Sequence, residues 1–364
     1  MRDNPSQMSA RRRLRHLYRT LPAILALAFA VYVLRSADMS RVAALVRSLG
    51  WRLPLLLLPN FTVTLIEAVA WRRSFALVGK RPALVPLVRV RLACEAVMLG
   101  LPSGALVSES LQPYLLKRRC GVSLETAVVA SVGRKFFVVV SHGLVLASVT
   151  FLAWPLIERV SQRTIGHGGL AWLLLAAAAF MIVTFGAGFA AGARTQIAER
   201  VRLALDRVAG RWLGAWLQRH APRFQRTDEQ LARFFGRDPR ALALPLLLYS
   251  AGWLVRGAET LVYLRLLGIS VSLTTATAIE SALVLLRSIA VPLPAGLGVQ
   301  DAAYVLTLEA LGVPDATTVG TAFVLLKRGK DLFWILVGFA LLALSERGRP
   351  AHAPQAIAAT APSP

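Results

Sequence analysis

Two pairs of adjacent basic residues lie in the middle of long apolar segments of this sequence. Arg134 and Lys135 form the first pair, and Lys327 and Arg328 form the second. At about 1.5 Å per helical residue, each pair lies about 18 Å along its segment, near the middle of a hydrocarbon layer about 30 Å thick. A charge at that depth costs about 3 kcal/mol unless it is paired or hydrated. Such residues therefore bind an anion or form ion pairs inside the protein.

Acidic residues that can neutralise these charges occur both nearby and far away in the sequence. Three local pairings have helical spacing: Lys327 with Asp331, Arg256 with Glu259, and Glu280 with Arg287. Arg134 and Lys135 have no acidic residue within four positions. Their partner must be an acidic residue that is distant in the sequence, such as Glu109 or Asp301, or else a ligand. We interpret the basic pairs as facing a ligand, and purely structural ion pairs remain the alternative.

Two similar motifs rich in proline and glycine precede the basic pairs. The segment 101–104 reads Leu-Pro-Ser-Gly and the segment 293–296 reads Leu-Pro-Ala-Gly; an acidic residue, Glu109 or Asp301, follows each proline by seven positions. Proline and glycine interrupt helices, and a helix that starts after the break presents its positive end to an anion. We therefore predict that the breaks shape a cavity through these residues: Pro102, Ser103, Gly104, Pro294, Gly296 and Gly298.

The predicted site takes an anion such as a lipid phosphate. The basic residues would hold the phosphate, and the acidic ones would orient them or receive a cationic part of a headgroup. The predicted substrate-binding residues are Arg134, Lys135, Lys327, Arg328, Glu109, Asp301 and Asp331. No residue is predicted to be catalytic, and no metal or cofactor is expected, because the histidines lack ligand spacing and no nucleotide-binding loop is present.

Composition indicates a membrane protein. The chain has 364 residues, 56% of them hydrophobic, which a soluble protein of this length cannot bury. We predict an all-α, polytopic helical bundle with full crossings at about 20–34, 53–71, 123–152, 170–191, 241–264 and 316–344. Two more apolar stretches, 84–116 and 274–312, are broken at their prolines and are predicted to form re-entrant hairpins.

The basic residues are distributed unevenly between the two sides of this topology. With both stretches re-entrant, 28 of the 42 Lys and Arg fall on one side and seven on the other. The positive-inside rule then places both termini in the cytoplasm. Three crossings separate the hairpins, so the repeats (about 53–152 and 241–344) should be inverted relative to each other. The net charge of +23 is explained by the membrane, and no nucleic-acid partner is expected.

The segments outside the crossings are also assigned. Residues 1–20 form a basic cytoplasmic N-terminus, 21–344 the membrane domain, and 345–364 an Ala/Pro-rich tail that is predicted to be disordered. Segment 35–52 has an amphipathic pattern and is expected to lie on the outer membrane surface. The insert 192–240 carries a basic amphipathic helix; we favour the cytoplasmic leaflet as its contact, with a partner protein as the alternative.

Several of these features occur together in one known family. They are the segments 101–109, 116–122 and 292–301, together with Arg134, Lys327, Arg328 and Asp331. With these residues the chain resembles the lysylphosphatidylglycerol synthase transmembrane region, a flippase-like family of bacterial and archaeal membrane proteins, over about residues 20–344. It is most similar to stand-alone members, including those associated with hopanoid lipid biosynthesis. Founding members carry an aminoacyl-transferase domain after the membrane region, whereas only about 20 residues follow the last span here.

The resemblance and the site together give a functional prediction. We expect a multi-pass protein of a bacterial inner membrane that binds an anionic lipid or lipid-linked intermediate and moves it between leaflets. Lysyl transfer is not expected, because the transferase domain is not seen. One alternative is a membrane-embedded transferase acting on a lipid headgroup, with Glu109 or Asp301 as general base. Another is a non-catalytic scaffold that binds lipid-biosynthesis enzymes through the segment 192–240.

Overall fold

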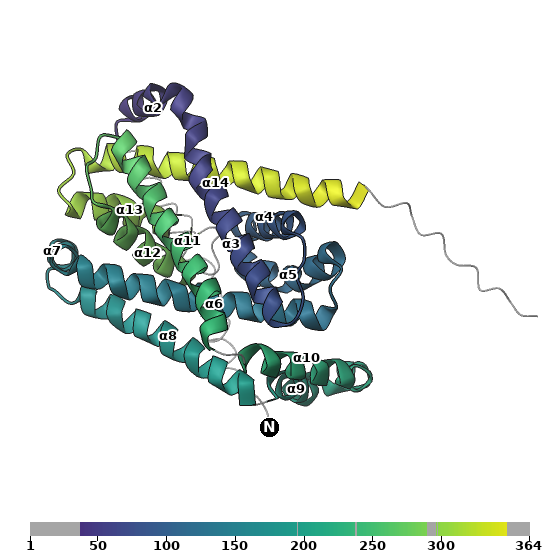
Figure 1. Ribbon diagram of the computed structural model, residues 1–364. Helices are drawn as coiled ribbons and strands as arrows, with labels where there is room; N and C mark the ends of the chain where they lie inside the picture. Colours follow the sequence, from purple (N-terminus) through teal and green to yellow (C-terminus); the bar gives the residue numbers. More distant parts are fainter. Residues whose placement is uncertain (1–36, 195, 237–238, 290–295, 297, 348–364) are drawn as a thin grey trace, which may run out of the picture.

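The computed structural model in Figure 1 describes residues 37–194, 196–236, 239–289, 296 and 298–347. Within these residues all regular structure is helical, which confirms the predicted all-α class. The elements are α2 (Met39–Ser48), the 3-10 helix η1 (Gly50–Leu57), α3 (Leu58–Leu77), α4 (Leu84–Gly100), α5 (Gly104–Cys120), α6 (Leu124–Leu152), α7 (Trp154–Ile165), α8 (Leu170–Arg194), α9 (Ile197–Arg219), α10 (Ala221–Phe235), α11 (Pro239–Leu266), α12 (Leu273–Ile289), α13 (Val299–Ala310) and α14 (Ala316–Arg347).

Four helical stretches in the described part of the chain are long and apolar enough to cross a membrane. They are Gly50–Leu77, Leu124–Leu152, Leu170–Gly188 and Arg240–Leu266. Each coincides with one of the crossings predicted at 53–71, 123–152, 170–191 and 241–264. A helix satisfies its own backbone hydrogen bonds in lipid, which is why apolar stretches of this length fold in this way. The chain is therefore a multi-pass integral membrane protein.

The other two predicted crossings have different outcomes. The first, 20–34, and the N-terminal segment 1–20 lie outside the described residues. The last, 316–344, is the single helix α14, whose 32 residues correspond to about 48 Å. Four charged residues interrupt its middle, between Lys327 and Asp331, so α14 is long enough to span but not continuously apolar. Most of the predicted tail also lies outside the described residues.

The stretch predicted to break at Pro102 consists of two helices. Helix α4 ends at Gly100 and α5 begins at Gly104, and Pro102 lies in the turn between them. Ser103 adopts a left-handed conformation with φ of 53°, which reverses the chain direction within three residues. The predicted break is therefore confirmed. The second stretch likewise divides into α12 and α13, but Pro294 lies outside the described residues.

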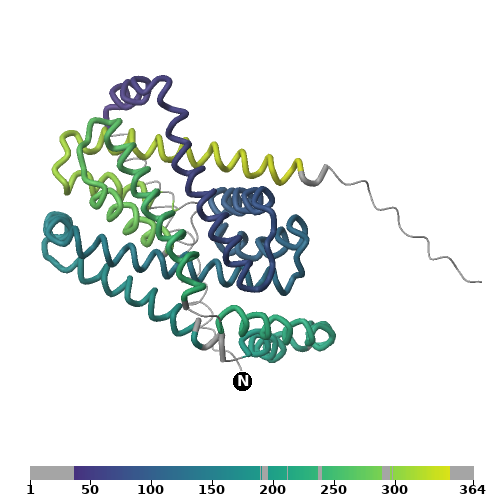
Figure 2. The backbone as a smooth tube through the Cα atoms, in the orientation of Figure 1, coloured from purple at the N-terminus to yellow at the C-terminus, as the bar shows by residue number. Residues whose placement is uncertain are grey.

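The order of helices is the same in two parts of the chain. The first half, α3 to α6, and the second half, α11 to α14, each contain a long helix, two short helices separated by a break, and another long helix. Their contacts correspond as well: α4 packs against α14 of the second half, and α12 packs against α6 of the first. Helices α3 and α11 lie side by side where the halves meet (Figure 2).

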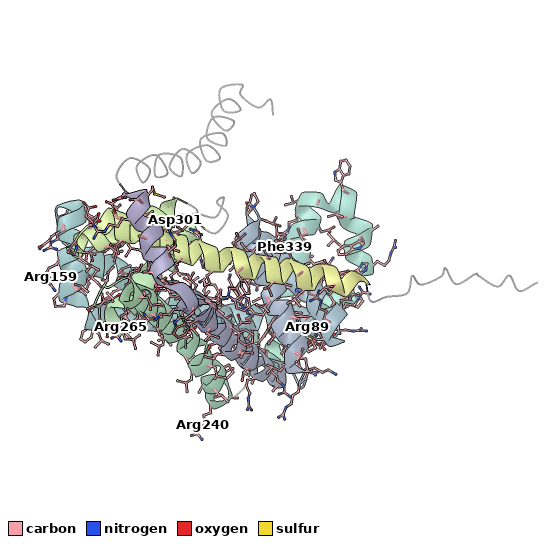
Figure 3. The ribbon with its side chains drawn as sticks, turned by 90° about the horizontal axis from the view of Figure 1, so that it is seen from above. Arg89, Arg159, Arg240, Arg265, Asp301 and Phe339 are labelled. Carbon is pink, nitrogen blue, oxygen red and sulfur yellow. The ribbon has the colours of Figure 1, made fainter. Side chains whose placement is uncertain are left out.

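The two broken stretches have their outer ends at opposite ends of α14. Arg119, in the last turn of α5, donates a hydrogen bond to the carbonyl oxygen of Leu341 near the end of α14 (3.3 Å). Arg163 of α7 donates to the carbonyl oxygen of Ala310, at the end of α13 and just before α14 begins (2.8 Å). Figure 3 shows the same separation, with Arg89 of α4 at one end of the molecule and Arg159 of α7 at the other.

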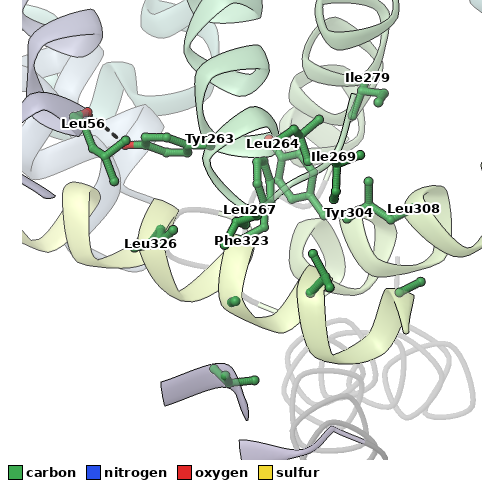
Figure 4. Close-up of a cluster of buried hydrophobic side chains, with 14 of the residues drawn as sticks. Leu56, Tyr263, Leu264, Leu267, Ile269, Ile279, Tyr304, Leu308, Phe323 and Leu326 are labelled. Carbon is green, nitrogen blue, oxygen red and sulfur yellow. Dashed lines mark hydrogen bonds between the residues drawn. The ribbon is translucent and has the colours of Figure 1, made fainter. Parts of the chain in front are cut away.

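Within the segment 35–52, which was predicted to be on the outer side, residues Met39–Ser48 form α2, but the apolar face of this helix is not available to a membrane. Val42 of α2 and Leu49, which directly follows α2, are 1% and 3% exposed and belong to a hydrophobic cluster shared with α11, α12, α13 and α14. Figure 4 shows this cluster around Tyr263, whose hydroxyl donates to the carbonyl oxygen of Leu56 (2.9 Å). The expectation of a surface-lying helix is corrected: the amphipathic pattern reflects packing against α14.

The insert 192–240 forms α9 and α10. Helix α10 packs against α6 and α8, and Asp228 accepts hydrogen bonds from the first backbone N–H groups of α9. The apolar face predicted on α9 is exposed, with Val208 and Trp212 88% and 87% accessible. An exposed apolar face beside many arginines fits an anionic membrane surface, which remains the prediction for this segment.

Candidate functional site

A cavity of about 380 Å³ lies where the two halves meet. Its wall is formed by α3 to α6 of the first half, by α11 to α14 of the second half, and by one residue of α8. Eight basic and seven acidic side chains line it: Arg91, Arg134, Lys135, Arg256, Arg287, Lys327, Arg328, Lys330, Glu67, Glu95, Glu109, Glu259, Glu280, Asp301 and Asp331. This is a large concentration of charge for a cavity enclosed by membrane helices.

Glu67 of α3 is the acidic centre of the first charge cluster. Its Oε2 accepts hydrogen bonds from Arg91 Nε at 2.7 Å and from Arg134 Nη2 at 3.2 Å, and its Oε1 accepts one from Arg256 Nη2 at 2.8 Å. Glu67 is only 6% exposed. One buried carboxylate thus compensates three guanidinium groups. Because Arg256 belongs to the second half, the cluster also joins the two halves.

Further polar groups surround this cluster. Arg91 also pairs with Glu95 at 3.2 Å, and Arg134 Nη1 donates to Gln112 Oε1 at 3.3 Å. Three buried donor atoms of the cavity wall have no hydrogen-bond partner among the described residues: Asn60 Nδ2, Gln112 Nε2 and Arg134 Nε. Buried donors in native proteins are nearly always paired, so this wall has donor capacity left for an acceptor.

Lys327 of α14 is the centre of the second charge cluster. Its Nζ donates to Glu280 Oε2 at 2.8 Å and to Thr260 Oγ1 at 3.0 Å, and it lies 3.3 Å from Glu259 Oε1. Lys330 Nζ donates to the same Glu259 oxygen at 2.7 Å. This cluster therefore connects α11, α12 and α14 through charges that are buried from solvent.

Two further ion pairs involve the short helices after the breaks. Lys135 Nζ lies 2.8 Å from Glu109 Oε1, and Arg328 Nη2 lies 2.6 Å from Asp301 Oδ1. The second oxygen of Asp301, a residue labelled in Figure 3, accepts a hydrogen bond from the backbone N–H of Gly298 at 2.9 Å and so caps α13. The side chains of the first pair are 48% and 38% exposed, against 20% and 10% for the second.

These ion pairs recur in the two halves at a nearly constant separation in sequence. The corresponding pairs are Arg134–Glu67 with Lys327–Glu259, and Lys135–Glu109 with Arg328–Asp301. The carboxylates are 192 residues apart in both cases, and the basic residues are 193 residues apart. The repeat seen in the sequence therefore includes its ion pairs, and not only its prolines and glycines.

The three local ion pairs expected from helical spacing do not form among the described residues. Arg256 pairs with Glu67 and Glu280 pairs with Lys327, in both cases across helices. Asp331 pairs with the basic residues one and three positions before it. Side chains that face a common cavity from different helices have closer partners there than along their own helix, which local spacing does not reveal.

All seven residues predicted to bind a substrate lie on the wall of this one cavity. Other members of the wall, above all Glu67 and Arg91, are not among the residues predicted from the sequence. Glu67 lies inside the predicted crossing 53–71, and an acidic residue within a span was the signal that could have identified it. Arg91 lies in the predicted apolar stretch 84–116, where it was not included among the binding residues; it belongs to α4 and is 5% exposed.

The residues of the first break, predicted to shape the cavity, are not among those that line it. Pro102 and Ser103 form the turn between α4 and α5. A Cβ atom at Gly104 would overlap the carbonyl oxygen of Val97 and lie 2.7 Å from that of Met98. Glycine is therefore needed here because the start of α5 lies directly against the end of α4.

At the second break, Gly296 and Gly298 are described, whereas Pro294 is not. Gly296 has a φ of +65°, and a Cβ atom there would lie 2.7 Å from Cγ of Arg287. Gly298 precedes α13 and donates its backbone N–H to Asp301. These glycines thus allow close contact with one charged residue of the cavity wall and capping by another.

The uncharged wall includes one histidine. His142 stacks on Trp253 with ring centroids 4.0 Å apart, and its Nε2 lies 3.0 Å from the carbonyl oxygen of Ser281. The described residues contain no group of three or more His, Cys, Asp or Glu side chains arranged to hold a metal ion. What the wall offers is a dense set of charges and hydrogen-bond donors, which suits an ionic group.

Comparison with known proteins places the chain in a family. The profile of the lysylphosphatidylglycerol synthase TM region matches residues 20–338. Searches of curated proteins and of solved structures found no match. The matched region contains the first half of the membrane domain, the second half up to residue 338, and every charged residue of the cavity wall. The chain therefore belongs to the lysylphosphatidylglycerol synthase transmembrane-region family.

Proposed function

We propose that this protein binds an anionic lipid, or a lipid-linked intermediate, in the central cavity and moves its headgroup between the leaflets of the membrane. The observation that carries the proposal is the cavity itself: a charged site enclosed by membrane helices and lined by both halves of the chain. Ionisable residues at such a depth generally mark the path of a substrate. Membership of a flippase-like family supports the same function.

The chemistry of the wall supports an amphiphilic substrate. Beside its charged groups the cavity has an apolar surface formed by Met98, Leu99, Val138, Val139, Met181, Val284 and Leu285. The volume of about 380 Å³ falls within the roughly 300–1,000 Å³ of small-molecule sites, enough for a headgroup but not for two acyl chains. The headgroup would occupy the cavity while the chains remain in lipid.

The predicted basic residues would reach a phosphate by changing partners. Arg134, Lys135, Lys327 and Arg328 each have a carboxylate partner in this structure. A phosphate entering the cavity would compete with those carboxylates, and Glu109, Asp301 and Asp331 would be freed for a cationic part of the headgroup. Exchange between ion pairs of similar strength keeps each charge compensated during passage.

We further propose that the two halves form an inverted repeat with re-entrant hairpins. The outer ends of α4 and α5 lie beside the end of α14, and the outer end of α13 lies just before its beginning. This supports entry of the hairpins from opposite faces of the membrane. Arginine and lysine counts support a cytoplasmic location for both termini, in a bacterial inner membrane.

The ion pairs at the two breaks supply a basis for alternating access. Lys135 and Glu109 are accessible in this structure, whereas the corresponding Arg328 and Asp301 are largely covered. Exchange of these two environments would expose the cavity first to one leaflet and then to the other. Symmetry-related halves have two such arrangements of similar energy.

The test is a leaflet-resolved transport assay in proteoliposomes that contain a fluorescent anionic phospholipid and an impermeant quencher. Arg134→Ala/Arg328→Ala is expected to slow movement of the labelled lipid at least about tenfold, because two charge-assisted contacts are lost. The fold should survive: Glu67 retains two arginines, and Asp301 retains its hydrogen bond to Gly298.

The matched control removes two exposed arginines of α9, Arg200→Ala/Arg207→Ala, with the same change in charge. Its transport rate should equal that of the wild type. A wild-type rate in the folded cavity variant would contradict the proposal. Mass analysis of the recovered lipid adds a second readout, because an altered headgroup would favour the transferase alternative over transport.

A further inference from the structure

We infer that Arg287 is the residue that binds the phosphate group of the substrate before the other basic residues do. This inference rests on the proposed function and names a residue of the same site. Seven of the eight basic side chains on the cavity wall form an ion pair with a carboxylate. Arg287 forms neither an ion pair nor a hydrogen bond with any described residue.

The surroundings of Arg287 explain why it lacks a partner within the described part of the chain. It lies in the last turn of α12, and its side chain passes over Gly296 at the second break. The residue that corresponds to Arg287 in the first half, 192 positions earlier, is Glu95, which pairs with Arg91 one turn before it. The position that corresponds to Arg91 is Leu283. In the second half the acidic residue of this pair is thus replaced by the basic Arg287, and the residue that would pair with it is replaced by the apolar Leu283.

Charge balance on the wall gives the same result. Among the described residues, eight basic and seven acidic groups leave an excess of one positive charge on the wall, and Arg287 is the basic group without a carboxylate partner there. A guanidinium in a membrane-enclosed cavity is stabilised by an anion, and its planar set of donors matches two oxygens of a phosphate. Asn60 and Gln112, 3% and 2% exposed, each contribute an unpartnered donor to the same wall. The ligand chemistry is therefore a phosphate group with one negative charge, as in a phosphodiester.

Binding of short-chain phosphatidylglycerol to the full-length protein in detergent tests this inference. Arg287→Gln is expected to weaken binding at least about tenfold, because a charge-assisted bidentate contact is lost. Arg287→Lys keeps the charge but not the planar donor set, so its affinity for the lipid should lie between those of the wild type and Arg287→Gln. The matched control is Arg265→Gln, the same change at an exposed position in the last turn of α11, and it should bind as the wild type does.

Thermal melting without lipid separates a binding role from a structural one. Arg287→Gln should melt at or above the wild-type temperature, because the side chain has no ion pair to lose; a lower melting temperature would indicate a structural role and overturn the inference. If Arg287→Gln binds the lipid as tightly as the wild type does, the inference about Arg287 is also overturned. The proposed function is not contradicted by that result, because the wild type still binds the lipid.

A competition with inorganic phosphate identifies the source of the phosphate group. If phosphate alone binds the wild type as tightly as the lipid does, and Arg287→Gln abolishes that binding, Arg287 is a site for free phosphate. That result supports the chemistry of the residue but contradicts the proposed lipid substrate. If phosphate competes only weakly, the acyl chains contribute to binding and the substrate is a phospholipid.

Discussion

Glu67→Gln is expected to destabilise the protein strongly, because one carboxylate compensates three arginines. Its oxygens accept from Arg91, Arg134 and Arg256 at 2.7–3.2 Å, in an environment where Glu67 is 6% exposed. The amide keeps the shape and one acceptor but removes the charge. Breaking a buried ion pair by removing one partner costs about 3–5 kcal/mol, and here the remaining positive charges also repel each other.

The measurement is the melting temperature of the purified protein in detergent, together with its yield from the membrane. The matched control is Glu309→Gln, which makes the same chemical change at an exposed position of α13 and should leave both values unchanged. Glu67→Asp keeps the charge on a shorter side chain, so its melting temperature should fall between those of Glu67→Gln and the control Glu309→Gln. A wild-type melting temperature in Glu67→Gln would mean that the three arginines are compensated by other groups.

Lys327→Met is expected to have the second largest effect, with a loss of about 3–5 kcal/mol. The ammonium group donates to Glu280 and Thr260 and lies 3.3 Å from Glu259. Without it, Glu280 is left as a buried carboxylate whose remaining partners among the described residues are the neutral hydroxyl groups of Thr260 and Tyr304. A charge in that position is costly because hydroxyl donors do not compensate it.

Removing both charges should recover most of this loss. In Lys327→Met/Glu280→Gln the amide still accepts hydrogen bonds from Thr260 and Tyr304, which contact Glu280 at 2.6 and 2.7 Å. Replacing both members of a buried pair by neutral groups of similar size is often neutral. The double variant should therefore melt above either single variant. If the two losses add instead, Lys327 and Glu280 do not stabilise each other.

Much of the helical framework can be predicted from the sequence, because apolar runs and prolines act locally. Four crossings and the break at Pro102 are where the pattern places them. The amphipathic pattern of 35–52 also predicts a helix correctly. The pattern does not reveal what covers the apolar face of this helix. In the structure Val42 packs on α14, but a helix lying on a membrane surface would have the same amphipathic pattern.

The candidate site could be predicted in part. The repeat aligns Glu109 with Asp301 and Arg134 with Lys327, and the structure brings all four to one cavity. Their partners were less accessible to prediction, because Glu67 lies 67 residues before Arg134 and local spacing favours nearer acids. Pairing across helices depends on which helices are neighbours, and a single sequence does not contain that information.

Transport between leaflets requires inverted halves that give the shared cavity access to both faces of the membrane. Cysteine labelling with an impermeant reagent, applied from each side of sealed vesicles after replacement of the native cysteines, tests this directly. Four exposed sites mark the outer ends of the two hairpins: Lys80→Cys, Ser123→Cys, Ser270→Cys and Pro314→Cys. We expect labelling of Lys80→Cys and Ser123→Cys from the cytoplasmic side, and of Ser270→Cys and Pro314→Cys from the opposite side. Labelling of Lys80→Cys and Ser123→Cys from different sides, or of all four from one side, would contradict this expectation.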